Sequence, residues 1–236
     1  MKLLYEFRDK FLTGDVLTRL LLINCAMFVL VLLAHVLFTL ITMSSNVTVA
    51  GIFQFPASPF RLAFRPWTLI TPMFTSYGLW HFLFNMLALY WMGGIFQQYY
   101  TNSHLRGLYI LGALAGMVFY MATYQTISIA ADRDWADAMP MTSCAVLAFS
   151  TALAFKAPNH QEQIPLVGNV KVKYIVIAIA LVDAALLPHI NPATDAAHAG
   201  AALCGWLFCR MLSKGHDITK PVTAFFVWLY GLMRRR

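Results

Sequence analysis

Apolar runs long enough to cross a membrane recur along this chain. The first covers residues 17–42 and contains a single Lys or Arg, Arg19. A helix needs roughly 20 apolar residues to cross a bilayer core, and every backbone group inside lipid must be paired within the protein. The chain is 60% hydrophobic and only 11% charged, a balance that a water-soluble domain does not tolerate. The runs therefore predict an integral membrane protein built from helices.

We predict an all-α polytopic membrane protein whose six transmembrane helices form one bundle within residues 17–212. Residues 1–16 are expected to precede the bundle as a cytoplasmic segment. Residues 213–236 are expected to follow it as a basic cytoplasmic tail, for which an interfacial helix fits better than a seventh span. The predicted spans cover residues 17–42, 78–98, 104–126, 139–156, 172–188 and 195–212.

The longest predicted connection, residues 43–77, lies on the outer side and is rich in proline and aromatic residues. It contains Pro56, Pro59, Pro66 and Pro72. This composition is typical of an ordered loop that dips partly into the membrane. A plain hydrophobic loop packed on the bundle explains the same residues equally well, and the sequence leaves both open.

The Lys and Arg residues predict how the bundle is oriented. With a cytoplasmic N-terminus, fourteen of the 17 Lys and Arg residues fall in inner segments and three in outer ones. Cytoplasmic loops are enriched in these residues, so both termini are predicted to be cytoplasmic. The net charge of +7 then reflects orientation in the lipid bilayer, and nucleic acid is not predicted as a partner. The four cysteines lie in apolar segments without a CxxC pair, so neither a disulfide framework nor a zinc site is expected.

Four polar side chains are predicted at one depth in the membrane. His81 and Asn85 lie four residues apart in the second span and therefore share a helix face. Ser143 lies near the start of the fourth span and His198 near the start of the sixth. These three spans all run from the outer to the inner side. Polar groups inside a membrane are costly, which makes this layer a candidate functional site.

The chemistry that fits these side chains is acyl transfer. A serine hydroxyl becomes a good nucleophile when a base takes its proton, and histidine is the usual base near neutral pH. The oxyanion that forms needs fixed donors, which His81 and Asn85 can supply. Asp183, toward the outer end of the fifth span, is a candidate to orient His198, but nothing in the sequence places it there.

Each of these residues also has a structural interpretation. A single serine in a transmembrane helix commonly bonds to its own helix backbone or allows close packing. His35, in the first span, is interpreted as a buried and paired histidine. The His81 and Asn85 pair alone could join helices as a polar contact. The catalytic hypothesis therefore depends on all four residues occurring together.

Three stretches, in this order and at this spacing, resemble the rhomboid family of intramembrane serine proteases, and the segments VGNVKVKYIVIAIALVD and RMLSKGHDI resemble one bacterial branch of it. RPWTLITPMFTSYGLWHFLFNMLALYWMGG (residues 65–94) resembles the family's first loop and second helix, with its HxxxN motif. MTSC (141–144) lies where the family carries GxSG, and AHAGAALCG (197–205) resembles its sixth helix. The resemblance covers roughly residues 65–218.

The resemblance implies a six-helix core with a Ser–His dyad and no catalytic aspartate. Ser143 would be the nucleophile and His198 the base, while His81, Asn85 and the Ser143 backbone N–H would form the oxyanion hole. The implied substrates are single-pass transmembrane proteins cleaved in or near their membrane segment. The implied location is the bacterial cytoplasmic membrane, with no metal or cofactor.

The sequence also departs from the family pattern. Met141 and Cys144 replace the two glycines of GxSG, and Ala201 replaces a glycine of the sixth helix, whereas Gly205 is retained. Gln97 is interpreted as the replacement for a third-helix glutamate that commonly anchors the first loop. These changes leave an alternative open, a pseudoprotease that binds transmembrane helices without cleaving them. A transporter or channel is a third, less favoured interpretation.

Overall fold

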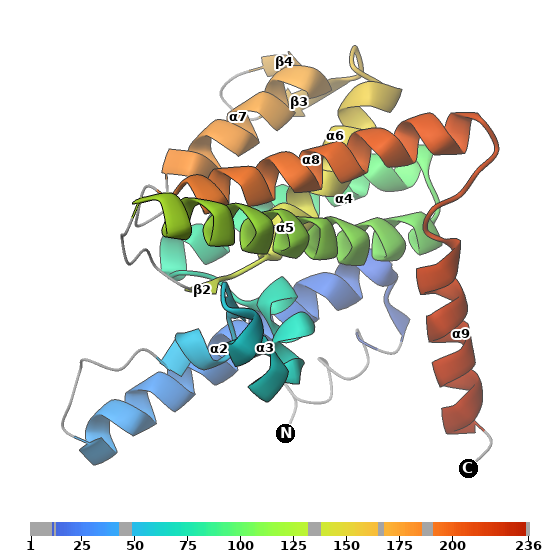
Figure 1. Cartoon of the computed structure of the whole chain (residues 1–236). Helices are drawn as coiled ribbons and strands as arrows, with labels where there is room; N and C mark the ends of the chain where they lie inside the picture. Colours follow the sequence, from blue (N-terminus) through green and yellow to red (C-terminus); the bar gives the residue numbers. More distant parts are fainter. Residues whose placement is uncertain are drawn as a thin grey trace.

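The computed structural model describes residue 11 and residues 13–42, 49–131, 138–164, 168–185 and 191–234. Helices occupy all six positions predicted as spans (Figure 1). Two further helices, α3 (Pro59–Phe64) and α9 (Lys220–Arg234), bring the described part of the chain to eight α-helices. The six helices at the predicted spans are α2 (Val16–Thr42), α4 (Leu79–Tyr99), α5 (Asn102–Ala131), α6 (Thr142–Lys156), α7 (Val172–Ala185) and α8 (Pro192–Ser213).

Three of these helices are long and apolar enough to cross a membrane: α2, α4 and the part of α5 up to Ile127. Helix α6 is apolar but has only 15 residues. Exposed side chains such as Leu33, Leu37 and Ile41 cover the second half of α2, as expected for a helix in lipid. The structure thus supports a mostly helical membrane protein. That the chain crosses the membrane six times stays a prediction.

Two small antiparallel sheets correct the expectation of an all-α chain. Strands β3 (Gln161–Ile164) and β4 (Gly168–Lys171) form a hairpin between α6 and α7. Strands β1 (Phe55–Pro56) and β2 (Ala138–Met139) join the long loop to the segment that leads into α6. Both pairs lie in connections between the predicted spans, except that Met139 of β2 is the first residue of the predicted span 139–156.

Helix α6 is the centre of the bundle, packed against α4, α5, α7 and α8 (Figure 1). Every residue from Thr142 to Leu153 is buried. Glycines on the neighbouring helices permit this close approach, because a methyl group at Gly112 of α5 would collide with the Ala148 side chain. A methyl group at Gly205 of α8 would collide with the Ala148 carbonyl oxygen. Small residues at such crossings let helix backbones come together.

The long loop is ordered over residues 49–77 and contains short helices: η1 (Val49–Ile52), α3, η2 (Pro66–Leu69) and η3 (Thr71–Phe74). Residues 43–48 lie outside the described part. The Gln125 side chain of α5 donates to the Ala57 carbonyl (3.0 Å), and the Tyr109 hydroxyl of α5 donates to the Met73 carbonyl (2.7 Å). These bonds anchor the loop to the third long helix.

The interpretation of Gln97 as the anchor of this loop is wrong. Gln97 lies near the C-terminal end of α4, not on the third long helix, and its amide donates to Asp15 (2.8 Å) and Asn102 (2.7 Å). It therefore ties the start of α2 to the α4–α5 turn. The loop-anchoring amide is that of Gln125, which occurs nearly 30 residues later.

His35 also differs from its interpretation as a paired histidine. It is half-buried on α2, and its Nδ1 atom is buried without a hydrogen-bond partner in the described part of the chain. It lines an apolar cavity of about 310 Å³ between α2 and the residues that precede α4. Asn24 on the same helix is buried and paired, because its amide donates to the Tyr109 hydroxyl (3.0 Å).

The tail forms helix α9, which runs across the direction of α5 and α8 (Figure 1). The guanidinium of Arg106 in α5 lies 5.2 Å from the Phe226 ring, a cation–π contact that holds α9 to the bundle. Phe225 and Trp228 are exposed. An interfacial position for this helix remains a prediction.

Candidate active site

The start of α6 is fixed by hydrogen bonds to the long loop. The Met141 N–H donates to the Pro72 carbonyl (2.7 Å). The Thr142 hydroxyl lies within hydrogen-bond distance of the carbonyls of Thr75 (2.7 Å) and Met73 (3.0 Å). Ser143 is consequently held as the second residue of α6. Its backbone N–H is one of the first-turn donors that an α-helix leaves unpaired.

Helix α8 brings His198 to Ser143. Asn191 caps the helix through a bond from the Ala193 N–H to its side-chain oxygen (2.9 Å), and Pro192 occupies the first turn. The close α6–α8 crossing at Gly205 lies about two turns after His198. The Ser143 hydroxyl oxygen then lies 2.9 Å from Nε2 of His198. Residues 55 positions apart in the sequence are therefore in direct contact.

His81 and Asn85 share one face of α4, as their spacing predicts. The Asn85 amide donates to the His81 carbonyl (2.9 Å) and lies 3.3 Å and 3.4 Å from the two nitrogens of the His81 ring. Tyr77 contacts the same ring edge-on, with centroids 5.4 Å apart. Both side chains are buried, with exposed fractions of 3% for His81 and 2% for Asn85. Their polar groups are therefore held in place away from bulk water.

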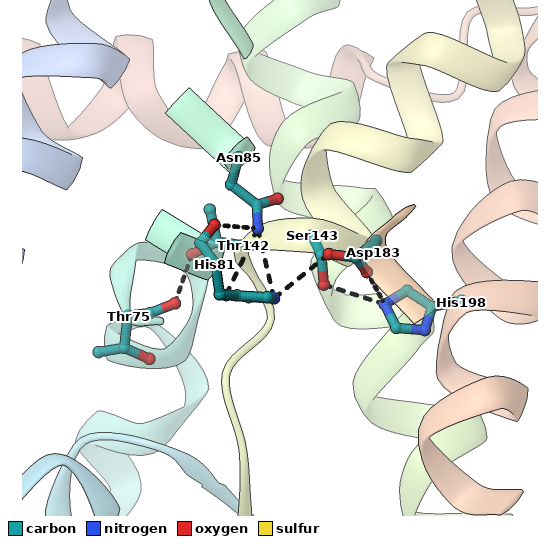
Figure 2. Close-up of polar contacts among 7 residues, drawn as sticks. All are labelled: Thr75, His81, Asn85, Thr142, Ser143, Asp183 and His198. Atoms are coloured by element: carbon teal, nitrogen blue, oxygen red, sulfur yellow. Dashed lines mark hydrogen bonds and ion pairs between the residues drawn. The ribbon is translucent and has the colours of Figure 1, made fainter. Parts of the chain in front are cut away.

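Asp183 of α7 links the two pairs (Figure 2). Its Oδ2 atom lies 2.8 Å from Nε2 of His198, and its Oδ1 atom lies 3.2 Å from Nε2 of His81. The residue is 4% exposed. Sequence reasoning named Asp183 only as a candidate to orient His198 and did not place it between the two histidines. The available signal was that Asp183 is an acid near the interior of an apolar span.

The result is one connected polar layer formed by four helices, shown in Figure 2. Ser143 comes from α6, Asp183 from α7, His198 from α8, and His81 and Asn85 from α4. Among the described residues, no group of three or more His, Cys, Asp or Glu side chains is arranged to hold a metal ion. The arrangement combines a hydroxyl, an imidazole that can accept its proton, and nearby donors. It is therefore suited to nucleophilic chemistry on a carbonyl group.

The residues that replace the GxSG glycines are both accommodated inside the bundle. Met141 is fully buried and precedes α6. Cys144 is fully buried against α5, where Gly116 provides the space, because a methyl group there would lie 2.9 Å from the Cys144 sulfur. The missing glycine of α6 is thus compensated by a glycine on the neighbouring helix.

The fold and this layer define a polytopic membrane protein with a partly buried serine–histidine contact. The Rhomboid domain family model matches residues 63–215, and the chain belongs to the rhomboid family. The curated "Rhomboid-like protein 16, chloroplastic" of Arabidopsis thaliana is 26% identical over 155 residues, which cover 65% of this chain and 39% of that protein. The chain therefore matches well under half the length of this relative. No solved structure matches the chain.

Proposed function

We propose that this protein is an intramembrane serine endopeptidase that cleaves single-pass membrane proteins in or near their transmembrane segment. The observation that carries the proposal is the 2.9 Å contact, partly buried, between the Ser143 hydroxyl and Nε2 of His198. Family membership supports the same chemistry. The membrane-spanning helices around the site support a substrate that is itself in the membrane.

In the proposed reaction, His198 takes the hydroxyl proton as the Ser143 oxygen attacks the scissile carbonyl carbon. His81, the Asn85 amide and the Ser143 N–H donate to the oxyanion, and the positive end of the α6 dipole favours the same charge. His198 then passes the proton to the leaving amine. A water molecule, deprotonated by His198, releases the acyl group and restores Ser143.

The proposed location is a bacterial cytoplasmic membrane, with both termini in the cytoplasm. The distribution of Lys and Arg residues supports this orientation. Ser143, near the start of α6, then lies toward the outer side, from which water reaches the site. Protease accessibility of tags fused to the two termini, in inside-out and right-side-out vesicles, tests the orientation. Protection of either tag in inside-out vesicles would contradict it.

Labelling by a fluorescent fluorophosphonate tests the activity, using purified protein in detergent. In the expected result, the wild-type protein is labelled and Ser143→Ala is not. Ser150→Ala is the matched control, because Ser150 is a fully buried serine on the same helix, about two turns away. Labelling of Ser143→Ala, or loss of labelling in Ser150→Ala alone, would refute Ser143 as the nucleophile.

A rhomboid-like protein that binds transmembrane helices without cleaving them is the second candidate. Met141 favours it, because a bulky residue replaces the glycine two positions before the serine. This candidate predicts that the wild-type protein is not labelled and that Met141→Gly gains labelling. The third interpretation, a transporter or channel, predicts intramembrane charge pairs. The Asp183 contacts are of that kind, but Ser143 shares the same imidazole.

A further inference from the structure

The proposed reaction needs the imidazoles of His198 and His81 to be free, but the carboxylate of Asp183 contacts both of them. It lies 2.8 Å from the His198 nitrogen that contacts Ser143, and 3.2 Å from a nitrogen of His81. In a Ser–His–Asp triad the acid contacts the other ring nitrogen of the histidine and leaves the first one free for the serine. Here the acid and the serine share Nε2. Asp183 therefore competes with Ser143 for Nε2 of His198. It does not orient the imidazole through the other ring nitrogen, as a triad aspartate does.

Sharing one ring nitrogen has a chemical consequence. To activate Ser143, Nε2 of His198 must present its lone pair to the hydroxyl. A carboxylate at 2.8 Å instead favours a proton on Nε2, because an N–H donor stabilises the buried negative charge. Two acceptors lie beside this one nitrogen, Oδ2 of Asp183 at 2.8 Å and the Ser143 hydroxyl oxygen at 2.9 Å. In this arrangement His198 is a poor base.

The second carboxylate oxygen has the same effect on the oxyanion donors. Nε2 of His81 lies 3.2 Å from Oδ1 of Asp183, so the carboxylate attracts a proton on this nitrogen. The negative charge that develops on a substrate carbonyl oxygen needs that donor. A negatively charged group already in place repels the developing charge as well. The carboxylate therefore stands where the acyl group and its oxyanion would bind.

Helix α7, which carries Asp183, is packed less tightly than α6, which carries Ser143. Its buried residues are Val172, Ile175, Val176 and Asp183. An apolar cavity of about 290 Å³ separates α7 from α4 and extends to Val182, the residue before Asp183. The carboxylate can therefore leave the two imidazoles without disturbing the glycine contacts of α6.

We propose that Asp183 is an autoinhibitory residue, which blocks the base and the oxyanion donors until a substrate carbonyl displaces it. This inference rests on the proposed protease function. Asp183 acts through His198 and His81 and takes no part in bond making. Its removal should accelerate attack by Ser143 on any electrophile small enough to reach the site without a helical substrate.

The test compares rates of fluorophosphonate labelling in the wild-type protein, Asp183→Asn and Asp183→Ala. In labelling, the bond between the Ser143 oxygen and phosphorus forms as fluoride leaves, and the hydroxyl proton passes to His198. Charge-assisted hydrogen bonds are about twice as strong as neutral ones, so we expect Asp183→Asn to react about five- to tenfold faster. Asp183→Ala should react at least as fast. Asp195→Asn is the control, because Asp195 is an exposed acid in the first turn of α8.

The possible results separate the two proposals. Faster labelling of the Asp183 variants supports autoinhibition. Unchanged or slower labelling, with the wild-type protein labelled, overturns autoinhibition and leaves the protease function standing. Absence of labelling in the folded wild-type protein and in both folded variants overturns the protease function, and the inference with it.

A second measurement uses the wild-type protein alone and does not depend on whether the variants fold. The infrared difference spectrum between phosphonylated and free protein reports on carboxylates that change their surroundings. The chain has only ten Asp and Glu residues, which keeps this region of the spectrum simple. Displacement of Asp183 predicts a shifted carboxylate stretching band on labelling. A spectrum without a carboxylate difference band overturns the inference.

Discussion

Helices α6 and α7 follow one another in the chain and contact each other, yet they are held in different ways. In α6, twelve of the fifteen residues are buried, and glycines of α5 and α8 pack against its backbone. In α7, four of the fourteen residues are buried, and a cavity separates part of it from α4. The proposed nucleophile lies on the tightly packed helix and the competing carboxylate on the loosely packed one. Tight packing favours fixed geometry at Ser143, whereas loose packing favours movement at Asp183.

The largest expected effect comes from removing the base in the tightly packed region. His198→Ala should lower the labelling rate by roughly a thousandfold or more, because the serine loses its proton acceptor. His160→Ala, which removes a histidine in the turn after α6, should leave the rate unchanged. A time course of fluorophosphonate labelling, read by in-gel fluorescence, measures the rates of both variants. A His198→Ala rate within tenfold of wild type would contradict the proposed mechanism.

A matched pair of leucines measures the difference in packing between the two helices. Leu153 of α6 is fully buried, and Leu181 of α7 is 66% exposed. Leu153→Ala should lower the free energy of unfolding by about 2–5 kcal/mol through lost contacts and a cavity. Leu181→Ala should change it by less than about 0.5 kcal/mol. Thermal unfolding in detergent gives the comparison, and equal losses would mean that α7 is packed as tightly as α6.

Asn85→Ala tests the oxyanion donors on α4. The labelling rate should fall by roughly 10- to 1000-fold, because one donor among several is removed. Asn24→Ala is a suitable control, since Asn24 is a buried asparagine that bonds to Tyr109 and lies outside the site. Near wild-type labelling of Asn85→Ala would exclude the amide from that role.

Two glycine-to-alanine substitutions compare a glycine at a close helix crossing with a glycine that has no neighbour. Gly205→Ala places a methyl group against the Ala148 carbonyl oxygen and should destabilise the protein by about 1–3 kcal/mol. It should also slow labelling, because α6 and α8 carry Ser143 and His198. Gly94→Ala, on α4, meets no atom within 4 Å and should be neutral or stabilising by up to about 1 kcal/mol. A stable Gly205→Ala variant would show that the crossing can open at little cost.

The smallest expected effect concerns Asp217, in the connection between α8 and α9. Burial acts to raise the pKa of Asp217, but bonds from the Thr219 hydroxyl (2.6 Å) and N–H (2.8 Å), together with His104, hold it below the ordinary value. A carboxyl group with a lowered pKa in the folded state stabilises the protein above its unfolded pKa. That contribution is lost as the pH falls through the folded pKa, below about pH 4.

Hydrogen exchange of residues 214–223 at pH 5 and pH 3 measures this contribution. Exchange corrected for its intrinsic pH dependence should become faster at pH 3 in the wild-type protein. Asp217→Asn should show the faster exchange at both pH values. Equal protection of the wild-type segment at the two pH values would show that the carboxylate does not hold this connection.

The positions of the helices followed from the sequence alone, and so did the choice of four polar residues as a candidate site, whose role stays a prediction. Apolar runs in lipid must pair their own backbone groups, so each predicted span became a helix whose described ends lie within five residues of the prediction, while residues 186–188 of the fifth span lie outside the described part. The period of the helix also fixed that His81 and Asn85 share a face, because this relation depends on one helix only. The membership of the chain in the rhomboid family agrees with the resemblance carried by the HxxxN, MTSC and AHAGAALCG stretches.

Contacts between helices were decided by the tertiary structure. The sequence placed Asp183 in a span but not beside His81 and His198, and it assigned the anchoring amide to Gln97 when Gln125 makes the bond. From the sequence, His35 was interpreted as a paired histidine, although its buried Nδ1 has no partner in the described residues. The rotation and depth of one helix relative to another depend on which side chains and glycines meet at each crossing. The periodicity of one helix does not contain information on contacts between different helices, so only the tertiary structure shows them.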